Sequence, residues 1–333
     1  MSSKLVIPRE YSKEIRAMVN GTFPSKPKFT EEQYPKLDGK VVIVTGGSSG
    51  LGLEVAKSLL GSTNAKVYIF ARDKAKIDKA IKKLQLEVAQ EYNKKELNVH
   101  SIVIDLSDLT TIKPAAEEFL SKEKRIDIII HNAGVMTPPL GSKTKQGYEL
   151  QLGTNNIGPH LLQKFLDPLF IKTSKQNKPG ESRIVYVSAS AIFHAPKGGI
   201  HYADPNFKST KAEPFEIYAQ SKAVNILSAK YWTKAHPEAT NVVTVSLCPG
   251  FLKTELQRHL VGFEAFMINK LVHKARLGAY TELYAALSPD LTRSKTGSYV
   301  ESFGKLGKDR SDLDVIAAKK AWEFLDQQVE PYL

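Results

Sequence analysis

Short apolar runs alternate along this chain with longer stretches in which apolar residues recur every three or four positions. The runs are rich in Val and Ile and are flanked by polar, Gly or Pro residues, as buried strands are. They span residues 41–44, 66–70, 100–108, 126–134, 182–190 and 241–250, and stretches of helical period such as 53–60 separate them. Strands that alternate with helices form a parallel sheet that is covered on both faces. The pattern therefore predicts α/β architecture, with a doubly wound, Rossmann-type parallel sheet in a single domain.

Three segments interrupt this alternation. Residues 1–38 are polar and rich in Pro and Lys, so we expect an extension that packs on the outside of a domain at 39–333. Inserts at about 191–214 and 251–277 leave from the carboxyl ends of the fifth and sixth strands, where ligands bind in such sheets. We expect both inserts to form walls of a substrate pocket. The amphipathic insert 251–277 is equally compatible with core packing or with a homodimer contact.

Composition sets the broad class of the protein. The chain has 333 residues, of which 42% are hydrophobic, which is enough for a large core. No apolar run of membrane-spanning length and no secretory signal is present. Cys248 is the only cysteine, which rules out an intramolecular disulfide and favours a reducing, cytoplasmic location. The scattered histidines lack metal-ligand spacing, so we predict no metal site.

The formal net charge of +12 allows two interpretations, a nucleic-acid surface or solvated helix faces. Acidic residues are interleaved in the basic runs at helical period, which favours solvated faces. No nucleic-acid-binding motif is visible, so we predict no nucleic-acid partner. Positive potential that attracts an anionic cofactor explains the excess charge. Peripheral attachment to a membrane or lipid droplet, through residues 1–38 or 255–275, is the remaining alternative.

The sequence "TGGSSGLG" at 45–52 joins the first predicted strand to a helix. Glycines there permit a tight turn and let the backbone approach a pyrophosphate at the helix N-terminus. The residues expected to contact a nucleotide in this turn are Gly46, Ser48, Ser49, Gly50, Leu51 and Gly52.

The residues after the second and third strands bear on which nucleotide is bound. Arg72 follows the second strand and suits the 2′-phosphate of NADP(H), which we therefore expect in preference to NAD(H). Asp73 could contact a ribose, but an N-cap of the next helix is the favoured interpretation. Asp105, followed by Leu106, ends the third run and is expected to accept from the adenine amino group; a helix cap is the alternative.

Tyr218 and Lys222 are four residues apart in "FEIYAQSKAVN", a segment of helical character. Positions four apart share one face of a helix, so the ammonium can lie beside the phenol. A neighbouring cation favours the tyrosinate and lowers its pKa. The pair therefore predicts a phenol whose proton can be moved, on the same chain as a nucleotide site.

Five motifs in this order and spacing resemble those of the classical short-chain dehydrogenases/reductases. They are "TGGSSGLG" at 45–52, "NAGV" at 132–135, "TNNIG" at 154–158, "YAQSK" at 218–222 and "PGFLKT" at 249–254. The long insert before the tyrosine resembles the retinol dehydrogenase and protochlorophyllide reductase branch, and its fungal members in particular.

The resemblance implies roles for individual residues. Tyr218 would donate a proton to a carbonyl oxygen as hydride arrives from the nicotinamide. Lys222 would lower the pKa of that tyrosine and hold the nicotinamide ribose. Asn155 would support a proton relay through water, and its neighbour Asn156 is the alternative for this role. Further cofactor contacts are implied for Asn132, Ala133, Gly134, Pro249, Gly250, Leu252 and Thr254.

One position departs from the family pattern. The substrate-orienting serine of the family aligns with Ala189, which lies between Ser188 and Ser190. Strand alternation directs Ser188 to the opposite face from residue 189, whereas a kink at the strand end would bring Ser190 into the site. We expect Ser190 to serve, with Ser188 as the alternative. His131, where the family often has Asn, is expected to be a packed residue and not a catalyst.

The resemblance implies an NADPH-dependent carbonyl reductase that interconverts a ketone or aldehyde and an alcohol. The apolar insert 251–277 suggests a hydrophobic small-molecule substrate. The alternative is a catalytically silent NADP-binding sensor or scaffold with the same fold. The retained tyrosine–lysine pair favours the enzyme, and Ala189 weakly favours the sensor.

Overall fold

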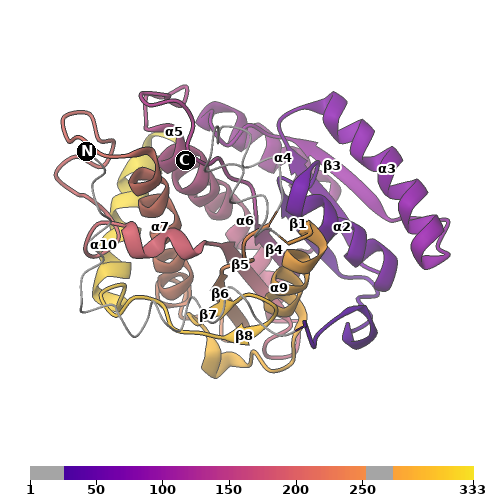
Figure 1. Ribbon diagram of the computed structural model, residues 1–333. Coiled ribbons are helices and arrows are strands. Elements are labelled where there is room, and N and C mark those ends of the chain that lie inside the picture. Colours follow the sequence, from indigo (N-terminus) through magenta and orange to yellow (C-terminus); the bar gives the residue numbers. More distant parts are fainter. Residues whose placement is uncertain (1–25, 253–272) are drawn as a thin grey trace.

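The computed structural model describes residues 26–252 and 273–333. Its centre is an eight-stranded sheet in the order β3-β2-β1-β4-β5-β6-β7-β8, parallel except for the antiparallel β8 (Figure 1). The strands are β1 Val41–Thr45, β2 Lys66–Ala71, β3 Val99–Val103, β4 Ile128–His131, β5 Ser182–Val187, β6 Val242–Leu247, β7 Tyr299–Glu301 and β8 Lys305–Leu306. The predicted doubly wound α/β fold is confirmed.

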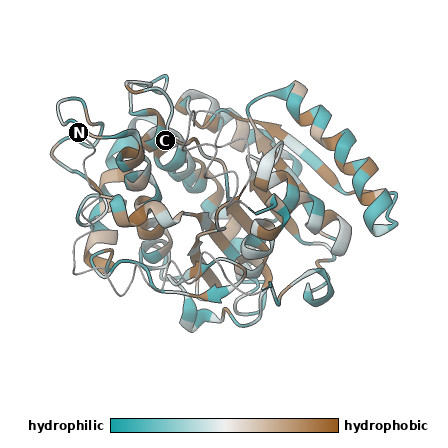
Figure 2. Ribbon diagram, in the orientation of Figure 1, coloured by the Kyte–Doolittle hydropathy of each residue, from teal (hydrophilic) through white to brown (hydrophobic). Residues whose placement is uncertain are grey.

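Helices cover both faces of the sheet. They are α2 Gly50–Ser62, α3 Lys74–Tyr92, α4 Ile112–Lys122, α5 Leu150–Leu152, α6 Gly158–Ser174, α7 Pro214–Ala235, α9 Ala275–Leu287 and α10 Val315–Val329. One apolar core lies between the sheet and α4, α6, α7 and α10, and the other lies between the sheet and α2, α3 and α9. Figure 2 shows the consequence, with hydrophobic strands at the centre and polar residues on the outer faces of helices such as α3.

Strands β1, β4, β5 and β6 are buried at every position, which explains why Val, Ile and Leu dominate their sequences. Strand β1 has β2 on one side and β4 on the other, so the direction of winding reverses there. A crevice at the carboxyl ends of the strands next to such a reversal is where nucleotides bind.

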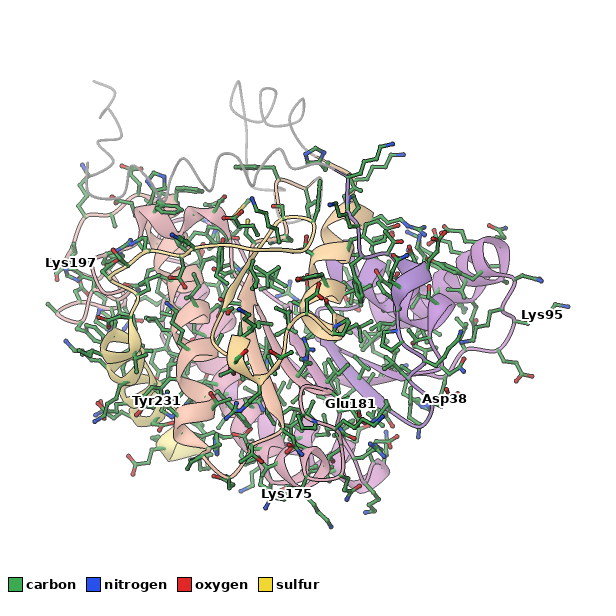
Figure 3. All side chains as sticks on the ribbon, turned by 90° about the horizontal axis from the view of Figure 1, so that it is seen from below. Asp38, Lys95, Lys175, Glu181, Lys197 and Tyr231 are labelled. Atoms are coloured by element: carbon green, nitrogen blue, oxygen red, sulfur yellow. The ribbon has the colours of Figure 1, made fainter. Side chains whose placement is uncertain are left out.

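Ion pairs connect the central strands at their amino-terminal ends, opposite the crevice. Figure 3 shows Asp38 and Glu181, which precede β1 and β5, on the same side of the molecule. The Lys40 ammonium lies 3.2 Å from the Glu181 carboxylate and 3.6 Å from that of Asp127. These contacts tie together the amino-terminal ends of β1, β4 and β5, away from the crevice.

The described part of the predicted extension, residues 26–38, lies against the domain. Tyr34 and Leu37 are buried in the core that includes α2 and α9, and the Phe29 ring contacts those of Tyr34 and Tyr284. Residues 1–25, and residues 253–272 of the second insert, lie outside the described part of the chain. Within the described ranges, no helix is long and apolar enough to cross a membrane.

Candidate active site

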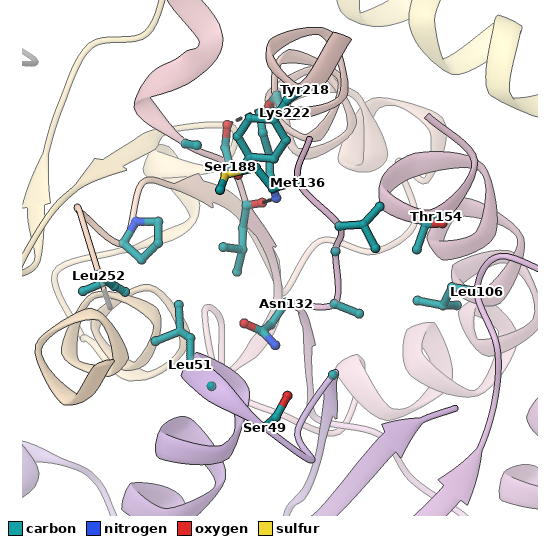
Figure 4. A pocket seen from close by; sticks show the side chains of 18 of the residues that line it. Ser49, Leu51, Leu106, Asn132, Met136, Thr154, Ser188, Tyr218, Lys222 and Leu252 are labelled. Carbon is teal, nitrogen blue, oxygen red and sulfur yellow. Dashed lines mark hydrogen bonds between the residues drawn. The ribbon is translucent and has the colours of Figure 1, made fainter. Parts of the chain in front are cut away.

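A pocket of about 330 Å³ opens at the carboxyl ends of the central strands (Figure 4). It gathers most of the residues predicted from the sequence: Gly46, Ser48, Ser49, Gly50, Leu51, Arg72, Asp105, Leu106, Asn132, Ala133, Gly134, Ser188, Ser190, Tyr218, Lys222, Pro249, Gly250 and Leu252. Gly52 and Asn155 are close to it but do not line it. Thr254 lies outside the described residues. The volume is within the range of small-molecule sites.

Two glycines of the first turn are required by geometry. Gly46 has φ +70°, a left-handed conformation that favours glycine. At Gly52, a Cβ atom would lie 2.4 Å from Asn132 Nδ2 and 2.7 Å from the Gly46 oxygen, so no larger residue fits. Asn132 Nδ2 in turn donates to the Thr45 oxygen at 2.8 Å. Gly52 therefore acts by letting α2 pack against the turn, and Gly46 by shaping the pocket floor.

Helix α2 directs its N-terminus into this pocket. It begins at Gly50, and the side chain of its N-cap residue, Ser49, makes no capping hydrogen bond. The first amide groups of a helix have no partners within the helix, and the helix dipole favours an anion there. The turn therefore offers backbone donors to a phosphate group.

Besides Lys222, two cationic side chains line the pocket, and both follow β2. Arg72 follows the last residue of β2, is exposed, and forms no hydrogen bond or ion pair with another described side chain. Lys76 lies four residues further on and also lines the pocket, although no sequence motif predicted this. Asp73 is the N-cap of α3, because its carboxylate accepts from the Lys76 amide at 3.0 Å. The preferred interpretation of Asp73 is thus confirmed.

Asp105 lies in the pocket wall, but neither at a strand end nor at a helix cap. Strand β3 already ends at Val103, and the Asp105 carboxylate accepts from the amide and hydroxyl of Ser107 at 2.9 and 2.6 Å. This local turn explains why the strand is shorter than predicted. The cap of the following helical turn is Asp108, which accepts from the Thr110 amide.

Tyr218 and Lys222 project from α7 into the opposite end of the pocket (Figure 4). Both are buried, with 5% and 4% of their surface exposed. The Lys222 ammonium lies 5.5 Å from the centroid of the Tyr218 ring and donates to the Val187 oxygen, at the end of β5, at 2.9 Å. The pair predicted from the four-residue spacing therefore lies in the same pocket as the glycine turn.

The electrostatics of this pair differ from the expectation. Burial raises the pKa of Tyr218, with a further contribution from Cys248, although we expected Lys222 to lower it. Burial lowers the pKa of Lys222 to about 8, against the opposing effects of Glu282 and Cys248. The expected lowering of the Tyr218 pKa by Lys222 is not met in this structure, because excluding water from a phenolate destabilises the charged form.

Asn155 and Asn156 belong to a π-helical turn, Gly153–Ile157, between α5 and α6. The Asn155 side chain accepts from the Val135 amide at 2.8 Å and donates to the Val135 oxygen at 3.0 Å and to Ser221 Oγ at 2.9 Å. Asn156 donates instead to Ser221 O and to Asn225 Oδ1, both at 2.8 Å. Asn155 thus joins the segment after Gly134 to α7, whereas both bonds from the Asn156 side chain go to α7. Such single π turns are frequent at functional sites.

The two candidate serines have different surroundings. The Ser188 hydroxyl is buried and donates to the Lys222 carbonyl oxygen at 2.7 Å. Ser190 is partly exposed to the pocket and begins a 3₁₀ helix, Ser190–His194. Burial raises the pKa of the Cys248 thiol, and hydrogen bonds from Gly250 and Ser190 oppose this rise. Ser190 therefore lies against the end of β6, on the pocket side.

A buried arginine near the C-terminus holds this part of the first insert. Arg310 donates to the oxygens of Ile192 at 2.8 Å, Ala195 at 2.6 Å and Pro196 at 3.1 Å, and it pairs with Asp312. The helix that begins at Ser190 is thus fixed by a residue more than a hundred positions away. No local sequence signal indicates this contact.

Several further apolar and polar side chains line the pocket that the sequence motifs did not predict. Met136 follows the motif at 132–135, Thr154 directly precedes Asn155, and Phe215 lies one helical turn before Tyr218. Cys248 directly precedes Pro249. Their adjacency to motif residues was the available signal.

His131 is a packed residue, as expected. It is buried, stacks on Tyr186, and contacts Gln163 Oε1 at 2.8 Å, and burial lowers its pKa to about 4. Among the described residues, no group of three or more His, Cys, Asp or Glu side chains could hold a metal ion.

The sequence model of the short chain dehydrogenase family matches residues 40–204. A short-chain dehydrogenase/reductase of Emericella nidulans, pkfC, is 39% identical over 320 residues, covering 95% of this chain and all of the relative. A short-chain dehydrogenase/reductase of Phomopsis amygdali is 38% identical and covers 93% of this chain and 96% of the relative.

Solved structures with the same fold include an uncharacterized protein of Mycobacterium paratuberculosis, with a TM-score of 0.66, 25% identity, and coverage of 90% of this chain and 97% of the other. An NADPH-bound carbonyl reductase from chicken fatty liver has a TM-score of 0.59 at 20% identity, covering 80% and 98%. A 3-ketoacyl-(acyl-carrier-protein) reductase of Brucella melitensis complexed with NADH has a TM-score of 0.57 at 21% identity, covering 78% and 95%.

Proposed function

The chain belongs to the short-chain dehydrogenase/reductase family of oxidoreductases, and we propose that it interconverts a ketone or aldehyde and an alcohol with NADP(H). The observation that carries this proposal is the placement of Tyr218 and Lys222 in the same pocket as the glycine turn. The cofactor, when bound, supplies or accepts the hydride. The protein supplies binding, orientation and the proton.

The residues of the pocket fit a dinucleotide. The backbone amides at the start of α2 can donate hydrogen bonds to the pyrophosphate. The tight turn before them depends on Gly52, because a Cβ atom there would clash with the turn. Arg72 and Lys76 support the preference for NADP(H), because both are cations and no carboxylate of the described residues pairs with Arg72. Solved neighbours include both an NADPH-bound and an NADH-bound reductase, so the preference rests on these side chains alone.

Tyr218 is suited to donate a proton to the carbonyl oxygen. Its raised pKa keeps the phenol protonated at pH 7, which is the form that an acid needs. The Lys222 ammonium, still largely charged at pH 7, would stabilise the phenolate that forms and bind the nicotinamide ribose. Ser190 would donate a second hydrogen bond to the same oxygen, and Asn155 would hold the pocket wall at Val135.

The pocket supports a hydrophobic substrate. Beside Tyr218 it is lined by Met136, Ala191, Phe215 and Phe251. Phe215 and Phe251 keep 44% and 42% of their surface exposed. An apolar ketone, aldehyde or alcohol would cover both rings.

Single-turnover oxidation of NADPH with a panel of apolar ketones and aldehydes tests the proposal. We expect wild-type protein to oxidise NADPH and Tyr218→Phe to bind it without turnover. Tight NADPH binding without turnover of any carbonyl by the wild type would instead support the sensor, which Ala189 in place of the family serine favours. Peripheral membrane or lipid-droplet attachment and a homodimer stay predictions, since residues 255–272 lie outside the described part.

A further inference from the structure

Two side chains of α7 share one backbone acceptor at the edge of the pocket. Lys222 Nζ and Asn225 Nδ2 both donate to the Val187 oxygen, each at 2.9 Å. The two residues are three positions apart and therefore lie on the same face of the helix. Val187 is the last residue of β5 and lines the pocket. A carbonyl oxygen has two lone pairs, so it can accept from both donors at once.

The orientation of the Asn225 amide is fixed by its neighbours. Asn156 Nδ2 donates to Asn225 Oδ1 at 2.8 Å and to the Ser221 oxygen at 2.8 Å. Both neighbours of the Asn156 amide are acceptors, so its nitrogen must point toward them. Since the Asn225 oxygen accepts from Asn156, the Asn225 nitrogen points toward the Val187 oxygen. Asn156 and Asn225 are buried, with 3% and 5% of their surface exposed. A rigid chain of amides therefore runs from the π-helical turn to the end of β5.

We propose that Asn225 is the positioning residue for Lys222. It holds the Val187 carbonyl, which among the described residues is the acceptor that the Lys222 ammonium uses. The direction of this carbonyl determines where the Lys222 ammonium lies beside Tyr218, 5.5 Å from the ring centroid. The ammonium uses one of its three N–H groups for this bond and keeps two for other partners.

The shared acceptor also lowers the free energy needed to move the Lys222 ammonium away from the Val187 carbonyl. If Lys222 leaves the carbonyl to engage a cofactor, Val187 keeps Asn225 as a partner. A buried acceptor left without any partner would be costly. Asn225 thus lets the ammonium shift within the pocket while the strand end stays fixed. This inference rests on the proposed role of Lys222 in cofactor binding.

Three variants test the inference through NADPH affinity measured across pH, together with kcat and KM. Asn225→Leu removes the amide at similar volume, and we expect NADPH affinity to fall at least tenfold. Asn225→Asp places a carboxylate next to Lys222, so the pH above which NADPH binding weakens should rise. Thr244→Val is the control: it removes the buried hydrogen bond from Thr244 Oγ1 to the Ala229 oxygen of α7 at 2.6 Å, together with a contact to Thr296, and Thr244 does not line the pocket.

The control should lose thermal stability but keep its NADPH affinity and pH profile. The inference is overturned if Asn225→Leu and Asn225→Asp behave like the control, with a lower Tm and unchanged affinity and pH dependence. Failure of the proposed reaction would look different. The wild type would then bind NADPH without reducing any carbonyl, and the binding measurements on Asn225 would still decide its role.

Discussion

The Ser188 hydroxyl donates a hydrogen bond of 2.7 Å to the backbone oxygen of Lys222. This bond turns the side chain into α7 and joins the end of β5 to the helix that carries the proposed proton donor. Both serines line the pocket, but the Ser188 side chain is buried and committed to α7, whereas Ser190, two residues on, is partly exposed. The two serines that flank Ala189 should respond differently to the loss of their hydroxyl groups.

For Ser190→Ala, we expect kcat to fall by roughly 10²- to 10³-fold with NADPH affinity unchanged, because a donor to the developing oxyanion is lost. For Ser188→Ala, we expect a loss of stability of about 1 kcal/mol and a much smaller change in kcat, because a buried hydrogen bond is lost. Steady-state kinetics and thermal unfolding of both variants measure these effects. The reverse ranking of kcat would assign the substrate contact to Ser188.

Cofactor affinity should depend on the charge of Lys222. Burial lowers the pKa of this lysine to about 8, so the ammonium is present at pH 7 and lost as the pH rises through 8. We expect the Kd of NADPH to increase above pH 8 by up to tenfold per pH unit, as one proton is lost. Isothermal titration at pH 6.5 to 9.5 measures this. Lys222→Met should bind more weakly at pH 7 and show no such bend; a bend that persists would have to come from another group.

Selectivity for NADPH over NADH should depend on Arg72. For Arg72→Ala, we expect the ratio of kcat/KM values to shift toward NADH by roughly 10- to 100-fold, the worth of one charge-assisted contact. Lys76→Ala should have a smaller effect in the same direction, since this cation also lines the pocket. Lys79→Ala, on the same helix but away from the pocket, is the matched control. An unchanged ratio in Arg72→Ala would remove the basis for the phosphate assignment.

The fold was largely predictable because the strands of a parallel sheet are buried on both faces and are therefore rich in Val and Ile. Strands β7 and β8 were missed because they have only three and two residues, and β8 is exposed. The π-helical turn at 153–157 was also missed, since its residues continue the helical period of α5 and α6.

In the site, local spacing placed Tyr218 beside Lys222 and predicted the cap at Asp73, because these contacts join residues within four positions. The direction of the Tyr218 pKa shift could not be read in this way, because it depends on how much water the whole fold excludes. The contact of Arg310 with the Ser190–His194 helix was equally hidden, since it joins segments far apart in the sequence.

A buried carboxyl group on α9 gives a prediction about stability. Glu282 has no exposed surface, and neither of its carboxylate oxygens has a hydrogen-bond partner in the described structure. Burial raises its pKa from 4.5 to about 8, and Lys222 only partly opposes this rise. The folded protein therefore keeps this proton between pH 4.5 and 8 while the unfolded chain releases it. Stability from this group is complete below pH 4.5 and declines as the pH rises toward 8.

Replacing Glu282 by Gln keeps the shape and removes the titration. Each pH unit above 4.5 costs the wild type up to 1.4 kcal/mol, so we expect Glu282→Gln to be more stable by ~2–3 kcal/mol at pH 7 and nearly equal to the wild type at pH 4.5. Urea unfolding of both proteins between pH 4.5 and 8 gives this difference directly. Glu117→Gln, an exposed change on α4, should track the wild type throughout. If the difference between Glu282→Gln and the wild type did not grow with pH, Glu282 would have to be ionised in the folded protein, with Lys222 compensating its charge across the end of the sheet.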